Sequence, residues 1–321
     1  MPKDQSVEVC AYPRPGQANP LVRLGIVSVA GGPVRWVDLS GYTEGTYLIT
    51  GAGWMPDSQR VYFYVQNRIQ TWLDLCAVNR SGGKPERLLR DSTEAWIESP
   101  GELTFLKDGS FLLSSERTGW KHLYLYDKKG QLQHAVTEGQ WEARTLHCVD
   151  EENGWVYFTG TRDSHIAENL YRVKLDVGTI ERLTQRSGHH RVNVSPNGKR
   201  FIDSWSDCAT PTRTMLCNGD GAHVRTLDTN PVYQREEYEF GEYRQFQIET
   251  SDGFLLEAGL LTPGDFDPNC KYPVWFTTYG GPHAPTIRET WSGGRAWDQM
   301  LAQMGALVFR CDPRSASGKG A

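Results

Sequence analysis

Residues 105–115 read FLKDGSFLLSS, which is an apolar residue, a polar turn containing Asp-Gly, and a run of β-forming residues. This order predicts a tight hairpin, because Gly and Asn tolerate the positive φ angles that such turns require. Three other segments share the layout: WMPDSQRVYFYV (54–65), VDEENGWVYFTG (149–160) and VSPNGKRFIDSW (194–205). The middle of the chain therefore repeats one structural unit.

A second hairpin pattern follows each of these segments, at residues 71–89, 121–137, 168–184 and 213–227. Each unit thus holds about four strands, and successive units begin 51, 44 and 45 residues apart. Such spacing is typical of β-propeller blades. Residues 21–40 resemble only the second half of a blade. We expect a mainly β fold that begins with a partial β-propeller of about four and a half blades.

The composition excludes several classes of protein. The chain has 321 residues with 34 Lys and Arg against 39 Asp and Glu, a net charge of -5. This acidic balance disfavours binding to nucleic acid or anionic lipid. No run of about 20 apolar residues exists that could span a bilayer, and the first residues lack the apolar core of a signal peptide. The chain therefore contains no predicted membrane segment, and its localisation stays open.

Cysteine and histidine give no sign of a metal or cofactor. None of the seven Cys lies in a C-x-x-C pair, so a zinc cage of that type is disfavoured, and we expect no metal and no cofactor. Cys208 and Cys217 could face each other across a hairpin, but spacing alone leaves their pairing open. We interpret His189 and His190 as residues of a solvated loop.

The repeat pattern ends near Tyr233. We place a boundary there, with a propeller over residues 1–235 and a second domain over 236–321. Two strands, 243–250 and 254–262, are followed by a buried apolar strand at 274–279. A helix at 295–304 and a strand at 306–309 complete a strand–helix–strand unit. This order predicts the first strands and helix of an α/β sheet.

The predicted helix carries an apolar stripe, because four large side chains recur at helical spacing. They are Trp297, Met300, Leu301 and Met304. Gly305 stands where a helix C-cap is expected.

Short motifs mark the ends of the two apolar strands and several blades. Tyr-Gly-Gly-Pro-His (279–283) follows the first strand, and Asp-Pro-Arg (312–314) follows the second. The propeller phrases are YPRPG with Asn19-Pro20 (12–20), SERTGWKHLY (115–124), TEGQWE (137–142) and NLY (169–171). With these motifs in this order, the chain resembles the dipeptidyl peptidase IV branch of the prolyl oligopeptidase family of serine peptidases.

The resemblance implies proteolysis through an acyl-enzyme, in which dipeptides are removed from peptide N-termini after Pro or Ala. The family uses a Ser-Asp-His triad on an α/β-hydrolase fold, with the Ser in a G-x-S-x-G turn. That sequence is absent here, since none of Ser292, Ser315 and Ser317 has Gly both two residues before and two residues after it. We therefore expect an internal fragment that is inactive alone, and whether the chain is an enzyme stays open. The alternative is a non-catalytic propeller module that binds proteins or peptides and carries a vestigial hydrolase tail.

The resemblance assigns one active-site residue to this chain. Tyr279 matches the tyrosine whose hydroxyl helps to form the oxyanion hole, although a Tyr that ends a strand can also be structural. Five residues are expected to shape the turns around it: Gly280, Gly281, Pro282, Asp312 and Arg314. Asp312 and Arg314 would hold their loop by a salt bridge or backbone hydrogen bonds. His283 comes too early in the chain to match the family's histidine.

The family also implies partners for a longer parent protein. These are peptide substrates and a second copy of the chain in a homodimer. Family members are often exported or periplasmic.

Overall fold

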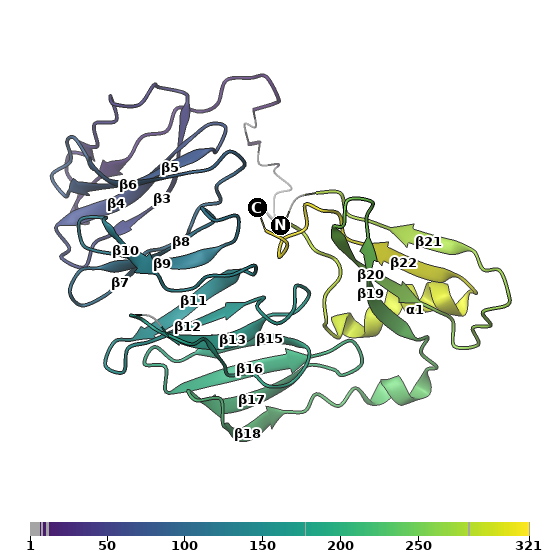
Figure 1. Cartoon of the computed structure of the whole chain (residues 1–321). Coiled ribbons are helices and arrows are strands. Elements are labelled where there is room, and N and C mark those ends of the chain that lie inside the picture. The colour runs from purple at the N-terminus through teal and green to yellow at the C-terminus, as the bar shows by residue number, and fades with distance from the viewer. Residues whose placement is uncertain (1–6, 8, 11–12, 177, 282, 321) are drawn as a thin grey trace. The chain divides into compact units, whose positions relative to one another are not determined.

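The structure, a computed structural model, describes residues 7, 9–10, 13–176, 178–281 and 283–320. The chain divides into two compact units, residues 1–110 with 127–131 and residues 111–126 with 132–321. Figure 1 labels most of the strands and the helix α1.

The first unit is built from antiparallel β-structure. Its strands are β1 (Gly25–Ile26), β2 (Arg35–Trp36), β3 (Tyr47–Trp54), β4 (Arg60–Asn67), β5 (Trp72–Asn79), β6 (Glu86–Ser92) and β7 (Thr104–Phe105). β1 pairs with β2, and β3 to β6 form a four-stranded sheet in chain order. Phe63 and Val65 of β4 pack with Val37 and Leu39 in one apolar cluster. The predicted half blade at residues 21–40 is therefore a short hairpin beside a complete four-stranded sheet.

The second unit continues the same order of strands. They are β8 (Phe111–Ser115), β9 (His122–Tyr126), β10 (Leu132–Ala135), β11 (Ala143–Asp150), β12 (Trp155–Gly160), β13 (Asn169–Lys174), β14 (Glu181–Arg182), β15 (His189–Val194), β16 (Arg200–Ser206), β17 (Arg213–Asn218) and β18 (His223–Asp228). β11–β14 and β15–β18 each form a four-stranded antiparallel sheet. In three of the repeats, the apolar residue that begins the sequence pattern is the last residue of the first strand: Trp54 in β3, Phe105 in β7 and Val194 in β15. The predicted partial β-propeller is confirmed.

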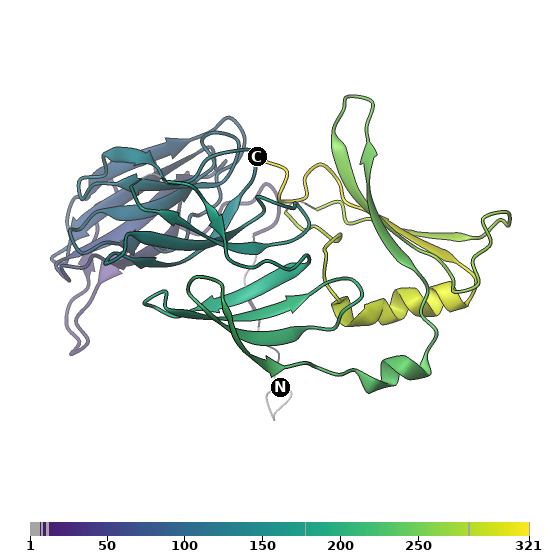
Figure 2. The ribbon, with the colours of Figure 1, turned by 60° about the horizontal axis from the view of Figure 1, so that its bottom comes forward.

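A different sheet follows the last blade. Its elements are η1 (Tyr233–Glu237), β19 (Tyr243–Glu249), β20 (Leu255–Leu261), β21 (Val274–Thr277), η2 (Ser292–Arg295), α1 (Ala296–Gln303) and β22 (Leu307–Cys311). The strand order is β19-β20-β22-β21, and only β21 and β22 run parallel. α1 lies along one face of this sheet (Figure 2), where Ala302 packs with Leu261 and Val308. The predicted strand–helix–strand unit is confirmed, and Gly305 follows the helix at φ 87°.

The apolar stripe of α1 packs on the sheet only in part. Leu301 packs against the cluster of Leu261, Ala302 and Val308, whereas Trp297 is 60% exposed, and the buried residues of the helix include Asp298 and Gln299. The reason is polar anchoring: Asp298 pairs with Arg310 of β22 at 2.6 Å. The prediction that the apolar strand at 274–279 is buried is wrong. Strand β21 lies at the edge of the sheet, and three of its four residues are exposed.

The interpretation of the histidine pair is also wrong. His189 and His190 begin strand β15 instead of lying in a solvated loop. His190 is buried, with Nδ1 2.9 Å from Asp203 and Nε2 3.0 Å from the carbonyl of Arg186. A polar side chain can occupy this core position because partners surround it. Cys208 and Cys217 are both free thiols.

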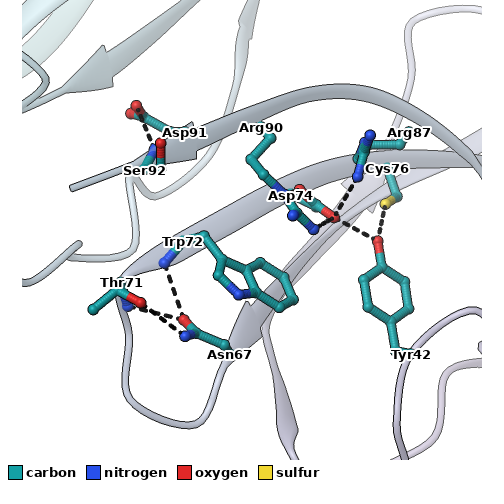
Figure 3. Close-up of polar contacts among 10 residues, drawn as sticks. All are labelled: Tyr42, Asn67, Thr71, Trp72, Asp74, Cys76, Arg87, Arg90, Asp91 and Ser92. Carbon is teal, nitrogen blue, oxygen red and sulfur yellow. Dashed lines mark hydrogen bonds and ion pairs between the residues drawn. The ribbon is translucent and has the colours of Figure 1, made fainter. Parts of the chain in front are cut away.

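A buried carboxylate organises the first four-stranded sheet. Asp74 on β5 is fully buried, and Arg90 of β6 donates to both of its oxygens at 2.5 and 2.8 Å. The Tyr42 hydroxyl donates to the same carboxylate at 2.8 Å (Figure 3). Burial, with the bonds to Cys76 and Asp74, raises the pKa of Tyr42, so the hydroxyl stays a donor. The cluster satisfies a charge that would otherwise be costly to bury.

Arg90→Gln should destabilise this unit, because Asp74 loses its two-point partner. We expect a loss of about 2 kcal/mol, less than for a fully buried pair because Arg90 is partly exposed and Tyr42 still donates. Urea unfolding followed by tryptophan fluorescence measures the change. Arg80→Gln, the same substitution at an exposed position in the turn after β5, is the matched control and should change stability little. Equal stabilities of the two variants would contradict the role of Asp74.

Candidate active site

The parallel strands β21 and β22 place their carboxyl ends at one edge of the sheet. Residues 278–281 follow β21 there, and residues 312–318 follow β22. The Thr278 hydroxyl donates to the carbonyl of Cys311 at 3.0 Å and so ties the two ends together. Ligands of open α/β sheets bind outside the carboxyl ends of the strands. This edge is therefore the place in the sheet where a binding site is expected.

Tyr279 lies at this edge, two residues after the end of β21. Its side chain is 53% exposed. A Cβ atom at Gly281 would come within 2.5 Å of the Tyr279 ring, whereas a Cβ at Gly280 would meet nothing within 4 Å. Gly281 therefore lets the backbone pass close to the ring, which limits where the ring can lie. Pro282 lies outside the described residues.

Asp312 fixes the chain that follows the Tyr279 turn. The carboxylate is 3% exposed and accepts hydrogen bonds from the Thr286 amide at 2.8 Å and its hydroxyl at 2.6 Å. Its other oxygen accepts from the Ile287 amide at 3.0 Å. One buried carboxylate thus joins the end of β22 to residues 286–287. Bonds of this kind, from backbone N–H groups to a charged acceptor, are among the stronger ones in proteins.

Arg314 contacts another loop, the turn between β19 and β20. Its guanidinium pairs with Asp252, donates to the Thr250 hydroxyl at 3.0 Å and lies 4.7 Å from the Phe254 ring centroid. It therefore joins residues 312–314 to the turn between β19 and β20. His283 has a positive φ of 58°, and its amide donates to the carbonyl of Ser315 at 2.8 Å. That bond joins the loop after β21 to the loop after β22. Both loops lie at the edge of the sheet where these strands have their carboxyl ends, called the carboxyl edge below.

Several residues that contact this edge were not predicted. Glu142 accepts a hydrogen bond from the Gly318 amide at 2.8 Å, and His165 Nδ1 donates to the Gly318 carbonyl at 2.5 Å. Lys319 and Glu257 form a largely buried ion pair at 2.5 Å. The TEGQWE phrase contained Glu142, but nothing in the sequence indicated that it would meet a loop 176 residues further on.

The arrangement at this edge offers a hydrogen-bond donor. The described residues contain no group of three or more His, Cys, Asp or Glu that could hold a metal ion. No helix in the described part of the chain is long and apolar enough to cross a membrane. At the carboxyl edge, the exposed phenol of Tyr279 lies on a turn. Asp312 and Arg314 hold the segments that neighbour this turn. The fold thus defines a class of protein, a partial β-propeller followed by the first strands and helix of an α/β-hydrolase domain.

Comparison with known proteins identifies the family. A family model described as the dipeptidyl peptidase IV (DPP IV) N-terminal region matches residues 1–212. The chain therefore belongs to the dipeptidyl peptidase IV family.

Individual relatives agree with this assignment. Dipeptidyl peptidase 4 of Trichophyton equinum is 25% identical over 293 residues, which cover 88% of this chain and 38% of that protein. Dipeptidyl peptidase 4 of Arthroderma otae is 25% identical over 323 residues, 96% of this chain and 42% of that protein. The crystal structure of Porphyromonas gingivalis dipeptidyl peptidase 4 matches with a TM-score of 0.88 and 27% identity, over 97% of this chain and 44% of that one. The chain thus spans less than half the length of these relatives.

Asp312→Asn should loosen residues 286–287 without unfolding the sheet. The amide group of Asn presents an N–H where Asp312 offered an acceptor, so one backbone donor loses its partner. We expect the Thr286 and Ile287 amides to exchange about 10- to 100-fold faster, the range set by loss of a charged hydrogen bond. Hydrogen-exchange mass spectrometry measures this. Asp267→Asn, at an exposed loop carboxylate that also accepts a backbone bond, should leave these amides unchanged.

The Arg314–Asp252 pair should titrate at low pH. The bond from Arg314, with a further bond from Thr250, lowers the pKa of Asp252 to about 2. A carboxyl whose pKa is depressed in the folded state stabilises that state above its unfolded pKa of about 4, and this contribution disappears as the pH falls towards 2. Arg314→Gln should raise the pKa of Asp252 towards 3.8, its ordinary value, in a carboxyl-carbon NMR titration. An unchanged titration would show that the pair does not form in solution.

Proposed function

We propose that this chain is part of a serine-type dipeptidyl peptidase that removes N-terminal dipeptides with Pro or Ala at the second position. The observation that carries the proposal is the position of Tyr279, exposed at the carboxyl edge of a parallel strand pair in a chain of this family. Residues 1–235 are assigned to the propeller and 236–321 to the beginning of the peptidase domain. Peptides are the proposed substrates, and a homodimer is the proposed state of the longer protein.

In this proposal Tyr279 contributes one step of the chemistry. Attack on a peptide carbonyl places negative charge on its oxygen, and a fixed O–H donor stabilises that charge most strongly in the transition state. Gly281 limits the position of the ring, and Asp312 holds the segment that follows the turn. The nucleophilic Ser, the Asp and the His are assigned to residues outside the 321 printed, because no G-x-S-x-G occurs among them. The printed chain alone should therefore not hydrolyse Gly-Pro p-nitroanilide.

Tyr279→Phe tests the assignment in a gene product that continues through a G-x-S-x-G sequence. The change keeps the ring and removes only the hydroxyl, so we expect kcat for Gly-Pro p-nitroanilide to fall about 100- to 1000-fold, the usual cost of one oxyanion donor. KM should change little, because the ground-state carbonyl gains less from that donor. The melting temperature should stay close to that of the parent.

Tyr272→Phe is the matched control. It removes a phenol hydroxyl that accepts a hydrogen bond from the Asp267 amide at 2.8 Å, on the connection that precedes β21. Its kcat should equal that of the parent. A Tyr279→Phe enzyme with parental kcat and a lowered melting temperature would show that Tyr279 is structural. Absence of any hydrolysis in the extended parent, with tight peptide binding retained, would favour a non-catalytic binding module instead.

A further inference from the structure

The first unit contains a pocket that the proposed peptidase chemistry does not use. It has a volume of about 520 Å³ and is lined by residues of the segment 38–47, of β5, of β6 and of the turn between these two strands. Ligand pockets for small molecules have volumes of roughly 300–1,000 Å³. The pocket is therefore large enough for a compound of one or two rings.

The aromatic wall of this pocket is held in place before any ligand binds. Asn67 Oδ1 accepts the amides of Thr71 and Trp72 at 2.8 and 3.0 Å, which fixes the start of β5 (Figure 3). The rings of Tyr42 and Trp72 stack at an angle of 22°, and the Tyr42 hydroxyl is held by Asp74. Tyr47, another lining residue, lies 5.9 Å from Tyr42 between ring centroids. A wall that is ordered in advance lowers the entropic cost of binding.

The rim of the pocket carries excess positive charge, although the whole chain has a net charge of -5. Its charged lining residues are Lys84, Arg87 and Arg90 against Asp38. Asp74 neutralises Arg90 through two short bonds, whereas its contact with Arg87 is longer, 3.7 Å. The Arg87 side chain remains 55% exposed. Arg87 and Lys84 thus provide the cationic groups that can meet a ligand.

We propose that this pocket binds a small anion attached to a planar ring, such as an aryl phosphate or an aromatic carboxylate. The anion lies at Arg87 and Lys84, because guanidinium and ammonium groups donate strong, charge-assisted hydrogen bonds to such oxygens. The ring lies against Tyr42 and Tyr47, because aromatic pairs gain more than their buried area alone provides. Arg90 is a positioning residue, since both of its bonds are made to Asp74.

Three probes separate the two parts of the proposal. Phenyl phosphate carries the ring and the anion, inorganic phosphate carries only the anion, and benzyl alcohol carries only the ring. Isothermal titration of the 321-residue chain should give an affinity for phenyl phosphate at least about tenfold above that for either other probe. Added salt should weaken the binding, because the cationic groups are exposed.

Variants locate the binding site. Arg87→Gln and Lys84→Gln should each weaken binding of phenyl phosphate by about tenfold, the scale of one charge-assisted hydrogen bond. Arg80→Gln removes an exposed arginine in the turn after β5 that does not line the pocket, and it should bind like the parent. Circular dichroism confirms that all three variants are folded. Equal affinity for inorganic phosphate, equal loss in the Arg80→Gln control, or no saturable binding of phenyl phosphate would each overturn the proposal.

Discussion

The burial of the second strand in each propeller repeat is the constraint on which the blades depend. Phe63, Phe111, Phe158 and Phe201 lie on these strands, and each is almost completely removed from water. The apolar side chains of a strand point to the two faces of its sheet, so they are removed from water only where other elements pack on those faces, which an isolated hairpin lacks. The polar turn and the β-forming run that recur along the sequence reflect this requirement.

The same constraint decides where polar groups are allowed. Asp74, His122 and Asp203 are buried, and each has hydrogen-bonding partners: Arg90 and Tyr42, Thr137 and the Gly139 carbonyl, and His190. Burial lowers the pKa of His122, which favours the neutral ring whose two nitrogens can accept from Thr137 and donate to Gly139. Such groups are tolerated in the core because each is hydrogen-bonded. Without a partner, each would cost more free energy than one hydrogen bond contributes on balance.

The sheet after the propeller uses polar anchoring in a different way. Asp312 and Arg314 do not fill a core but join loops, the first to residues 286–287 and the second to the turn at Asp252. Because parallel strands end at one edge, these anchors and Tyr279 come from segments that are distant in sequence but meet there. The donor proposed for catalysis is thus carried by a loop whose neighbours are fixed, which is the arrangement that preorganised electrostatic stabilisation requires.

The sequence alone determined the repeat, its strand order and the strand–helix–strand unit, because turn residues and apolar runs are local and periodic. It also identified the family through the order of short motifs, among them the Tyr279 turn. Only the tertiary structure decided which surfaces are buried. Trp297 has the spacing of a core residue yet is exposed, while the adjacent Asp298 is buried because Arg310 on another strand pairs with it. The meeting of Glu142 with Gly318 and the pocket beside Trp72 likewise depend on contacts between distant segments, and no local pattern in a single sequence encodes them.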